Sequence, residues 1–265
     1  MTRNETIVGV IGQGAIGAPV ALLLSQGAVS GAVLDCVVDI HKPMTQFARQ
    51  VDIDEAIARC DLLVECSGPG VVKDHGERIL DAGVDLLICS VGALADEGLA
   101  ERLRTPRAGR LFVTPGAIGG LEMLSAASSV GAFTEVVITT TKLPEPLVQP
   151  WMSEEESTRI RSTTTETEVF SGSAREAARR FPRSLNVAAS VALAVGDWNS
   201  VRVTLNADPC AVLTSHVIEA TGPAGSYRFE CRNHPSEDNP RTSGVVPFAV
   251  LRSLENIVGR TGGMI

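Results

Sequence analysis

Several features that would assign the protein to a class at once are missing from the sequence. None of its 265 residues belongs to an apolar run of the roughly 18 residues that a membrane span needs. The chain enters a strand-like apolar pattern too early for a secretion signal. Acidic residues (31) outnumber basic ones (23), for a net charge of −8, which disfavours nucleic acid or an anionic membrane as partner. We therefore expect a cytoplasmic protein that binds neither.

A recognisable metal-binding pattern is also missing. The six cysteines contain no C-x-x-C pair, and the four histidines show no ligand spacing. Four of the cysteines lie in or beside apolar runs, which is typical of reduced thiols in a protein core. The sequence therefore predicts neither a zinc enzyme nor a disulfide framework, and we expect no metal.

The first 120 residues alternate short apolar runs with longer amphipathic ones. Strands are predicted at residues 7–11, 33–40, 62–66, 84–89 and 111–113, with helices between them. This alternation indicates parallel βαβ units with right-handed crossovers. The fold class predicted here is α/β, a Rossmann-type doubly wound parallel sheet.

After residue 120 the pattern changes to alternating runs rich in Val, Ile and Thr. Strands are predicted at 135–143, 165–170, 201–207, 213–221 and 226–232, with helices at 174–180 and 186–195 and an exposed excursion at 151–164. The pattern favours a second, α+β domain with a mixed sheet, and a last helix at 245–258 that returns to the first domain. We expect domains at 1–120, completed by 240–265, and at 121–239.

A glycine motif follows the first strand directly: Gly12, Gln13, Gly14, Ala15, Ile16 and Gly17 form a complete G-x-G-x-x-G. Such a turn places helix N–H groups beside a pyrophosphate. Asp39, 22 residues after Gly17, ends the second strand, where a carboxylate accepts hydrogen bonds from the ribose hydroxyls. We expect NAD as cofactor. His41 and Lys42 leave NADP use open.

Three further loops follow predicted strands of the same sheet, at residues 66–69, 90–93 and 114–120. Ligands of open α/β sheets bind at the carboxyl ends of the strands. The small residues there, Ser67 among them, would let a nicotinamide ribose approach the backbone. Each loop taken alone is equally compatible with simple turn chemistry, but three at one edge favour a cofactor site.

The second domain must supply the chemistry, and three of its residues are candidates. His216 is either a buried structural histidine or the proton carrier that oxidation of an amine or alcohol carbon requires. Asn186, at the start of a helix of small residues, can cap that helix or contact a ligand. Arg241, in a turn-rich run, can bind a carboxylate or serve the local structure.

Taken together, these residues resemble the L-aspartate dehydrogenase family over nearly the whole chain. The resemblance rests on the following segments in this order: residues 12–17, 90–96, 116–120, 181–189, 215–222 and 233–243. The glycine motif is shared by many dehydrogenases, and the later segments are much more specific.

The resemblance implies NAD(P)-dependent oxidative deamination of L-aspartate, or a similar dicarboxylate, by a homodimer or higher homo-oligomer. The iminoaspartate product would hydrolyse to oxaloacetate and ammonia or feed NAD synthesis. In the family, the histidine at the position of His216 is catalytic, and the residues at Ala117 and Asn186 contact NAD.

The chain departs from the family at Ser184 and Leu185, at Leu143, and at Arg241, where a lysine is usual. Lys142 and Arg241 are our candidates for binding the substrate carboxylates. A related NAD(P)-dependent dehydrogenase or reductase for another small acid, and a non-catalytic NAD-binding regulator, remain alternatives. A purely structural interaction module would leave the glycine turn, Asp39 and the three loops without a purpose.

Overall fold

The computed structural model describes residues 5–41, 46–182 and 186–259. Lys42, Ser184 and Leu185, which the sequence singled out, lie outside the described residues. The chain divides into two compact units, residues 1–116 with 246–265, and residues 117–245. The sequence placed the corresponding boundaries at 120 and 240. Within the described part of the chain, no helix is long and apolar enough to cross a membrane.

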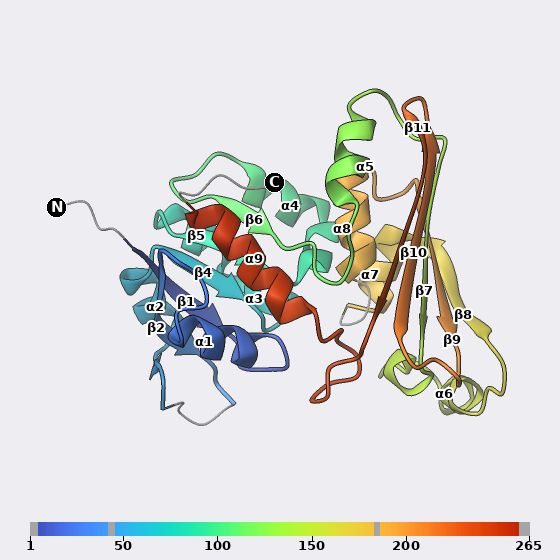
Figure 1. Cartoon of the computed structure of the whole chain (residues 1–265), viewed down its shortest axis with the longest axis horizontal. Helices are drawn as coiled ribbons and strands as arrows, with labels where there is room; N and C mark the ends of the chain where they lie inside the picture. Colours follow the sequence, from blue (N-terminus) through green and yellow to red (C-terminus); the bar gives the residue numbers. More distant parts are fainter. Residues whose placement is uncertain (1–4, 42–45, 183–185, 260–265) are drawn as a thin grey trace. The chain divides into compact units, whose positions relative to one another are not determined.

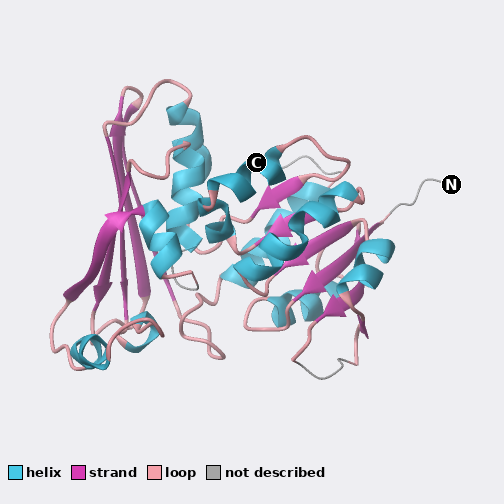
Figure 2. Cartoon of the chain, turned by 180° about the vertical axis from the view of Figure 1, so that it is seen from behind, coloured by secondary structure: helices cyan, strands magenta, loops and turns pink. Residues whose placement is uncertain are grey.

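The first unit contains a six-stranded parallel sheet in the order β3-β2-β1-β4-β5-β6, visible in Figures 1 and 2. Its strands are β1 (Thr6–Ile11), β2 (Ala32–Val38), β3 (Arg49–Gln50), β4 (Leu62–Glu65), β5 (Asp85–Ile88) and β6 (Leu111–Val113). Both β4 and the last three residues of β5 are fully buried, as expected of strands that are covered on both faces. The predicted doubly wound sheet is confirmed.

The helices of this unit are α1 (Gly17–Ser25), α2 (Ile53–Arg59), α3 (Pro69–Asp81), α4 (Glu97–Arg104) and α9 (Val246–Val258), with the short η1 (Val91–Ala95). Helix α1 packs on β1 and β2 and also contacts α9. The last helix therefore belongs to the first unit, as its sequence predicted. Its buried residues include Val250 and Leu254, one turn apart on a single face.

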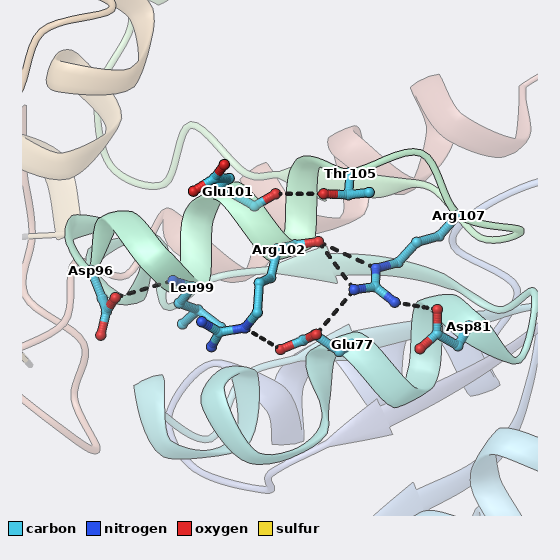
Figure 3. A network of polar contacts seen from close by, with 8 residues as sticks. All are labelled: Glu77, Asp81, Asp96, Leu99, Glu101, Arg102, Thr105 and Arg107. Atoms are coloured by element: carbon cyan, nitrogen blue, oxygen red, sulfur yellow. Dashed lines mark hydrogen bonds and ion pairs between the residues drawn. The ribbon is translucent and has the colours of Figure 1, made fainter.

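Helices α3 and α4 are joined by a network of ion pairs and hydrogen bonds (Figure 3). Glu77 of α3 accepts from Arg102 at 2.6 Å and from Arg107 at 3.0 Å, and Arg107 also pairs with Asp81. Asp96 caps α4 by accepting from the backbone N–H of Leu99 at 3.0 Å. Most of these side chains are substantially exposed, so each pair contributes little to stability.

The carboxyl ends of β1, β4, β5 and β6 lie at one edge of the sheet because the strands are parallel. Each strand is followed there by one of the segments that the sequence singled out: the glycine turn and the loops at 66–69, 90–93 and 114–120. The strand order reverses between β1 and β4, and ligands of doubly wound sheets bind at such a point.

The second unit contains a five-stranded sheet in the order β11-β10-β7-β9-β8. Its strands are β7 (Glu135–Lys142), β8 (Thr167–Ser173), β9 (Val201–Ala207), β10 (Thr214–Gly222) and β11 (Gly225–Asn233). Only the β7–β9 pair is parallel among these strands, so the predicted mixed sheet is confirmed. Gly222 pairs with Gly225, which closes the expected hairpin on the two residues Pro223 and Ala224.

One face of this sheet is covered by helices of the same unit (Figures 1 and 2). These are α5 (Leu121–Ser128), α7 (Ala174–Arg180) and α8 (Asn186–Val195). The buried residues of β7, β9 and β10 alternate along each strand, which matches a sheet packed on one side. At one end lie η2 (Glu145–Leu147) and α6 (Glu154–Arg161), which contact each other.

Two of these helices were not predicted. The excursion at 151–164 contains α6, which begins with a capping box formed by Ser153 and Glu156. That serine and that glutamate, three residues apart, are a recognisable start signal that the prediction from sequence did not use. Most residues of α6 are exposed, as expected of this excursion. Helix α5 has no such signal, because it begins after Gly120 in a left-handed conformation without a side-chain cap.

Candidate active site

The glycine turn after β1 has a geometry that only glycine tolerates at two of its positions. Gly12 has a φ of 92°, and a Cβ there would lie 2.8 Å from the Cα of Ser67. A Cβ on Gly17 would collide with the carbonyl oxygen of Gly12. The turn is therefore packed tightly against both the loop after β4 and the start of α1.

The remaining positions of the turn leave room and polar groups for a ligand. A Cβ added at Gly14 would meet no atom within 4 Å, so the backbone there is approachable. Ala15 and Ile16 are half-buried and lead into α1. The side chain of Gln13 is 5% exposed, and its Nε2 has no hydrogen-bond partner among the described residues. An open backbone at a helix start and an unpaired buried amide fit a diphosphate-containing cofactor.

Asp39 lies beside the turn, one residue beyond β2. Its Oδ2 accepts from the backbone N–H of Gln13 at 2.7 Å, and its Oδ1 accepts from the backbone N–H of His41 at 2.8 Å. Asp39 therefore holds the glycine turn in shape, a role that the sequence did not predict. A carboxylate at this position is compatible with the expected hydrogen bonds to a ribose.

Three other residues are expected to contact the cofactor, and two of them, Ala117 and Asn186, lie in the second unit. Ala117 is buried, and its carbonyl oxygen accepts from the side-chain amide of Asn233 at 2.8 Å. Asn186 is the first residue of α8 rather than the residue before it. Ser67 is exposed and lies in the loop after β4. The expected cofactor residues are thus divided between the two units.

His216 is the third residue of β10, an inner strand of the second sheet, and lies on the buried face of that strand. The side chain is 2% exposed, and its Nδ1 is 2.9 Å from the Oγ1 of Thr140 on the neighbouring strand. Burial, and to a lesser extent the nearby charge of Lys142, lower the pKa of His216 to about 3. The imidazole is therefore neutral at physiological pH, and its protonated form is disfavoured in the chain without ligands. Thr140 was not predicted from the sequence.

Lys142 follows Thr140 by two residues on the same buried face of β7. It is 4% exposed, and its ammonium donates a hydrogen bond of 3.4 Å to the carbonyl oxygen of Arg241. Burial lowers the pKa of Lys142 to about 8. A buried cation and a neutral imidazole on adjoining strands form a site suited to an anionic substrate that must lose a proton.

An open pocket of about 530 Å³ lies at the same end of β7. It is lined by residues 143–146, Arg161, Pro209 and residues 239–241. Arg161 donates to Glu145 at 2.8 Å, while the backbone N–H of Arg241 donates to the side chain of Asn239 at 3.1 Å. Arg241 is thus one of the residues that line this pocket. His216 is not among the lining residues.

Comparison with known proteins places this geometry in a family. Residues 12–108 match the sequence profile described as the NAD-binding domain of homoserine dehydrogenase. Residues 122–257, about half of the chain, match the profile described as the C-terminal domain of aspartate dehydrogenase. The chain belongs to the aspartate dehydrogenase family.

Relatives in this family resemble the chain over nearly its whole length. An L-aspartate dehydrogenase of Methanopyrus kandleri is 35% identical, with 94% of each chain covered. One of Ralstonia pickettii is 36% identical, with 94% of this chain and 96% of the relative covered. These matches confirm the predicted resemblance and the assignment to a family of NAD(P)-dependent amino acid dehydrogenases.

Solved structures agree with the family assignment. A crystal structure of aspartate dehydrogenase from Thermotoga maritima has a TM-score of 0.76 and 27% identity, and covers 98% of this chain and 100% of its own. A putative myo-inositol dehydrogenase from Sinorhizobium meliloti, at 15% identity and a TM-score of 0.55, covers 97% of this chain and 91% of its own. The second likeness shows the fold alone.

In this member of the aspartate dehydrogenase family, one group among the described residues has metal-ligand geometry: Asp35, Cys36 and Cys60. The two sulfur atoms are 3.5 Å apart, and both oxygens of Asp35 accept from Arg59, at 2.6 and 2.8 Å. A carboxylate held at both oxygens by a guanidinium is a poor metal ligand. The group is better described as a buried thiol pair beside an ion pair.

Glu65 is a further residue at the cofactor edge that sequence reasoning missed. It is the last residue of β4 and is completely buried, and its carboxylate reaches two of the loops at that edge. The signal was present in the sequence, because an acid at the end of an apolar run of this kind must be paired when it is buried.

Proposed function

We propose that this chain catalyses the NAD(P)-dependent oxidative deamination of L-aspartate to iminoaspartate, which hydrolyses to oxaloacetate and ammonia. The observation that carries the proposal is the buried pair of His216 and Lys142 on adjoining strands. This pair lies in the unit whose sequence matches aspartate dehydrogenases. A neutral base and a cation are the two groups that oxidation of an amino dicarboxylate requires.

The dinucleotide is assigned to the edge of the first sheet. The turn at residues 12–17 would hold the diphosphate, with Asp39 at the adenosine ribose and Ser67 near the nicotinamide ribose. From the second unit, Ala117 and Asn186 would contact the same cofactor. A nicotinamide cofactor held by these residues would supply the acceptor for the hydride from Cα of the substrate.

His216 is assigned to proton transfer at the substrate amino group. Its Nδ1 is engaged with the hydroxyl of Thr140, so Nε2 is the ring nitrogen that we assign to the exchange of the proton. The imidazole is neutral in the free protein, and the negative charge of a bound dicarboxylate would raise its pKa toward the range of a general base. Thr140 orients the ring and has no part in the reaction itself.

Lys142 and Arg241 are assigned to the two carboxylates of the substrate. Lys142 is buried and lies on β7, two residues after Thr140, which pairs with His216 on β10. This position suits it to the carboxylate nearer the reacting carbon. Arg241 lines the open pocket, which suits its planar guanidinium to the second carboxylate. A dicarboxylate would bring negative charge to Lys142 and so favour its protonated form.

The remaining predictions from the sequence concern the location of the protein in the cell, its oligomeric state and its preferred cofactor. The partner of this chain is a small molecule. We propose that the chain acts in the cytoplasm as a homodimer or larger homo-oligomer, and that its iminoaspartate can feed NAD synthesis. NAD is proposed as the preferred cofactor on account of Asp39, since a 2′-phosphate beside that carboxylate would face like charge.

Absorbance at 340 nm tests the proposal directly. The chain is incubated with NAD or NADP and a panel of amino acids, and then with NADH or NADPH, oxaloacetate and ammonia. Aspartate is expected to give the fastest reduction of the cofactor. Turnover with another acid and none with aspartate would favour a related dehydrogenase, and cofactor binding without any turnover would favour a regulator.

A further inference from the structure

Glu65 is the one fully buried carboxylate among the described residues of the cofactor edge. It ends β4, between the strand and the loop that contains Ser67. Burial raises the pKa of Glu65, while hydrogen bonds from the backbone of Gly68 and from Ser90 oppose that change. No step of the proposed reaction uses this group, so its presence in the interior needs another explanation.

The carboxylate is surrounded by hydrogen-bond donors from two loops. Its Oε1 accepts from the backbone N–H of Ser67 at 2.8 Å, from that of Gly68 at 2.7 Å and from the hydroxyl of Ser90 at 3.0 Å. Its Oε2 accepts from the backbone N–H of Ser90 at 3.0 Å. Only a group with two acceptor oxygens satisfies all of these donors at once.

Both loops begin a helix at the edge where the dinucleotide is expected. Gly68 is the residue that precedes α3, and Ser90 precedes η1. The carboxylate therefore joins the starts of two helices that follow neighbouring strands. Its backbone donors belong to residues that directly precede these helices, and a negative charge near a helix start is favourable.

The first of these loops also forms the wall behind the glycine turn. The Cα and the backbone nitrogen of Ser67 lie within 2.9 Å of the space that a Cβ on Gly12 would occupy. The backbone N–H of Cys66 donates to the carbonyl oxygen of Ile11 at 2.8 Å. Any movement of Ser67 therefore changes the support of the turn, whereas the opposite side of the turn, at Gly14, is open.

We propose that Glu65 is a positioning residue for the dinucleotide: its carboxylate fixes the loops at 66–69 and 90–93 in the arrangement that supports the glycine turn and receives the cofactor. The proposal rests on the dinucleotide site of the proposed function but not on the identity of the substrate. Glu65 acts through the loops and does not touch the reacting atoms.

Glu65→Gln is the variant that tests this role. An amide keeps the size of the side chain but has one acceptor oxygen, and its NH₂ group would face the N–H donors of the loops. Leaving buried donors without an acceptor is costly, so the loops should shift. We expect the Kd of NADH to rise at least about tenfold, with an unchanged number of binding sites. The KM for aspartate should change less than about twofold.

Titration of NADH fluorescence, without aspartate, separates this role from simple loss of fold. Partial unfolding would lower the number of sites at unchanged affinity, whereas displaced loops weaken every site. Hydrogen exchange supplies a second readout without cofactor: the amides of Ser67, Gly68 and Ser90 should exchange faster in Glu65→Gln. The matched control is Glu77→Gln, the same chemical change in the same unit, at the ion-pair network of α3, which should bind NADH like the unmodified chain.

If Glu65→Gln does not fold, the variant Ser90→Ala tests the role of Glu65 instead. It removes one donor from the carboxylate and leaves the backbone in place, and we expect a rise of about threefold in the Kd of NADH. Unchanged NADH affinity in folded Glu65→Gln, or in Ser90→Ala if the first variant is unfolded, would overturn the proposal for Glu65. An unmodified chain that binds neither NADH nor NADPH would overturn the proposed function as well.

Discussion

The two units of this chain build their parts of the site in different ways. In the first unit, the groups assigned to the cofactor are mostly backbone atoms of one short turn, arranged by glycine and by the carboxylates of Asp39 and Glu65. In the second unit, the groups assigned to the substrate include side chains from strands far apart in the sequence, Lys142 on β7 and His216 on β10, and Thr140 of β7 orients the imidazole. A site formed by the backbone of one turn can be recognised from a short sequence motif. A site formed by side chains of different strands depends on the register in which those strands pair.

The largest expected effect concerns the second unit. His216→Ala should lower kcat about 10²–10⁴-fold, because it removes the group assigned to proton transfer, while the Kd of NADH stays the same. Steady-state kinetics and NADH titration measure the two quantities separately. His75→Ala on α3 is the control and should retain full activity. Full turnover in His216→Ala would remove this residue from the mechanism.

The second prediction separates two glycines of the same turn. Gly17→Ala should lower both the free energy of unfolding, by about 1–3 kcal/mol, and NADH affinity, because the new Cβ collides with Gly12. Gly14→Ala has free space around its Cβ, so the stability should stay the same or rise by about 0.4–1 kcal/mol.

NADH affinity should nevertheless fall about tenfold or more in Gly14→Ala, because the methyl group occupies the space assigned to the phosphates. Thermal unfolding without cofactor and NADH titration of the two variants test this split. Equal NADH affinity in Gly14→Ala and the unmodified chain would contradict the assignment of the diphosphate to this turn.

The third prediction uses the buried cation. The pKa of Lys142 is about 8 in the folded chain against an ordinary value of 10.5, so between these values the unfolded chain holds a proton that the folded chain has released. Stability therefore rises with pH in that window, and the cost of the buried charge is fully present below pH 8. At 1.36 kcal/mol per pKa unit, Lys142→Met should raise the free energy of unfolding at pH 7 by up to roughly 3 kcal/mol.

This gain should shrink as the pH rises from 8 to 10.5, and denaturant unfolding at several pH values measures it. The same variant should raise the KM for aspartate strongly while NADH affinity stays unchanged. A variant that is less stable than the unmodified chain at pH 7 would show that the ammonium is better compensated than its burial indicates.

The smallest expected effect is that of Arg241→Lys. The residue keeps its charge and its position in the open pocket, but the planar fork that binds a carboxylate through two N–H groups is lost. We expect the KM for aspartate to rise about two- to tenfold with kcat nearly unchanged. Unchanged kinetics would assign Arg241 to the local structure of the turn rather than to the substrate.

Most of the fold could be predicted from local sequence patterns, namely hydrophobic periodicity and turn residues. Strand β9 has the predicted bounds, and the hairpin of β10 and β11 closes where its Gly-Pro-Ala-Gly sequence indicated. Helix α6 was not predicted because residues 151–164 are mostly polar, although its capping box can be recognised in the sequence. Helix α5 lacks a start signal because a left-handed glycine precedes it.

The candidate site was predictable only where its chemistry is local. The glycine turn and Asp39 could be predicted from their spacing, but the hydrogen bond that Asp39 accepts from the backbone N–H of Gln13 depends on the β1–β2 register. Thr140 and His216 are 76 residues apart, and only the antiparallel pairing of β7 with β10 joins them. Glu65 had a local signal, as an acid at the end of an apolar run, but the sequence could not predict its donor at Ser90, which is 25 residues away.

The most direct test of the account follows the hydrogen atom on Cα. The chain is incubated with NAD and L-aspartate that carries deuterium at Cα, and the reduced cofactor is analysed by mass spectrometry. The account predicts that each reduced nicotinamide contains one deuterium and that oxaloacetate appears in equal amount. Reduced cofactor without deuterium, or no reduced cofactor with either NAD or NADP, would contradict it.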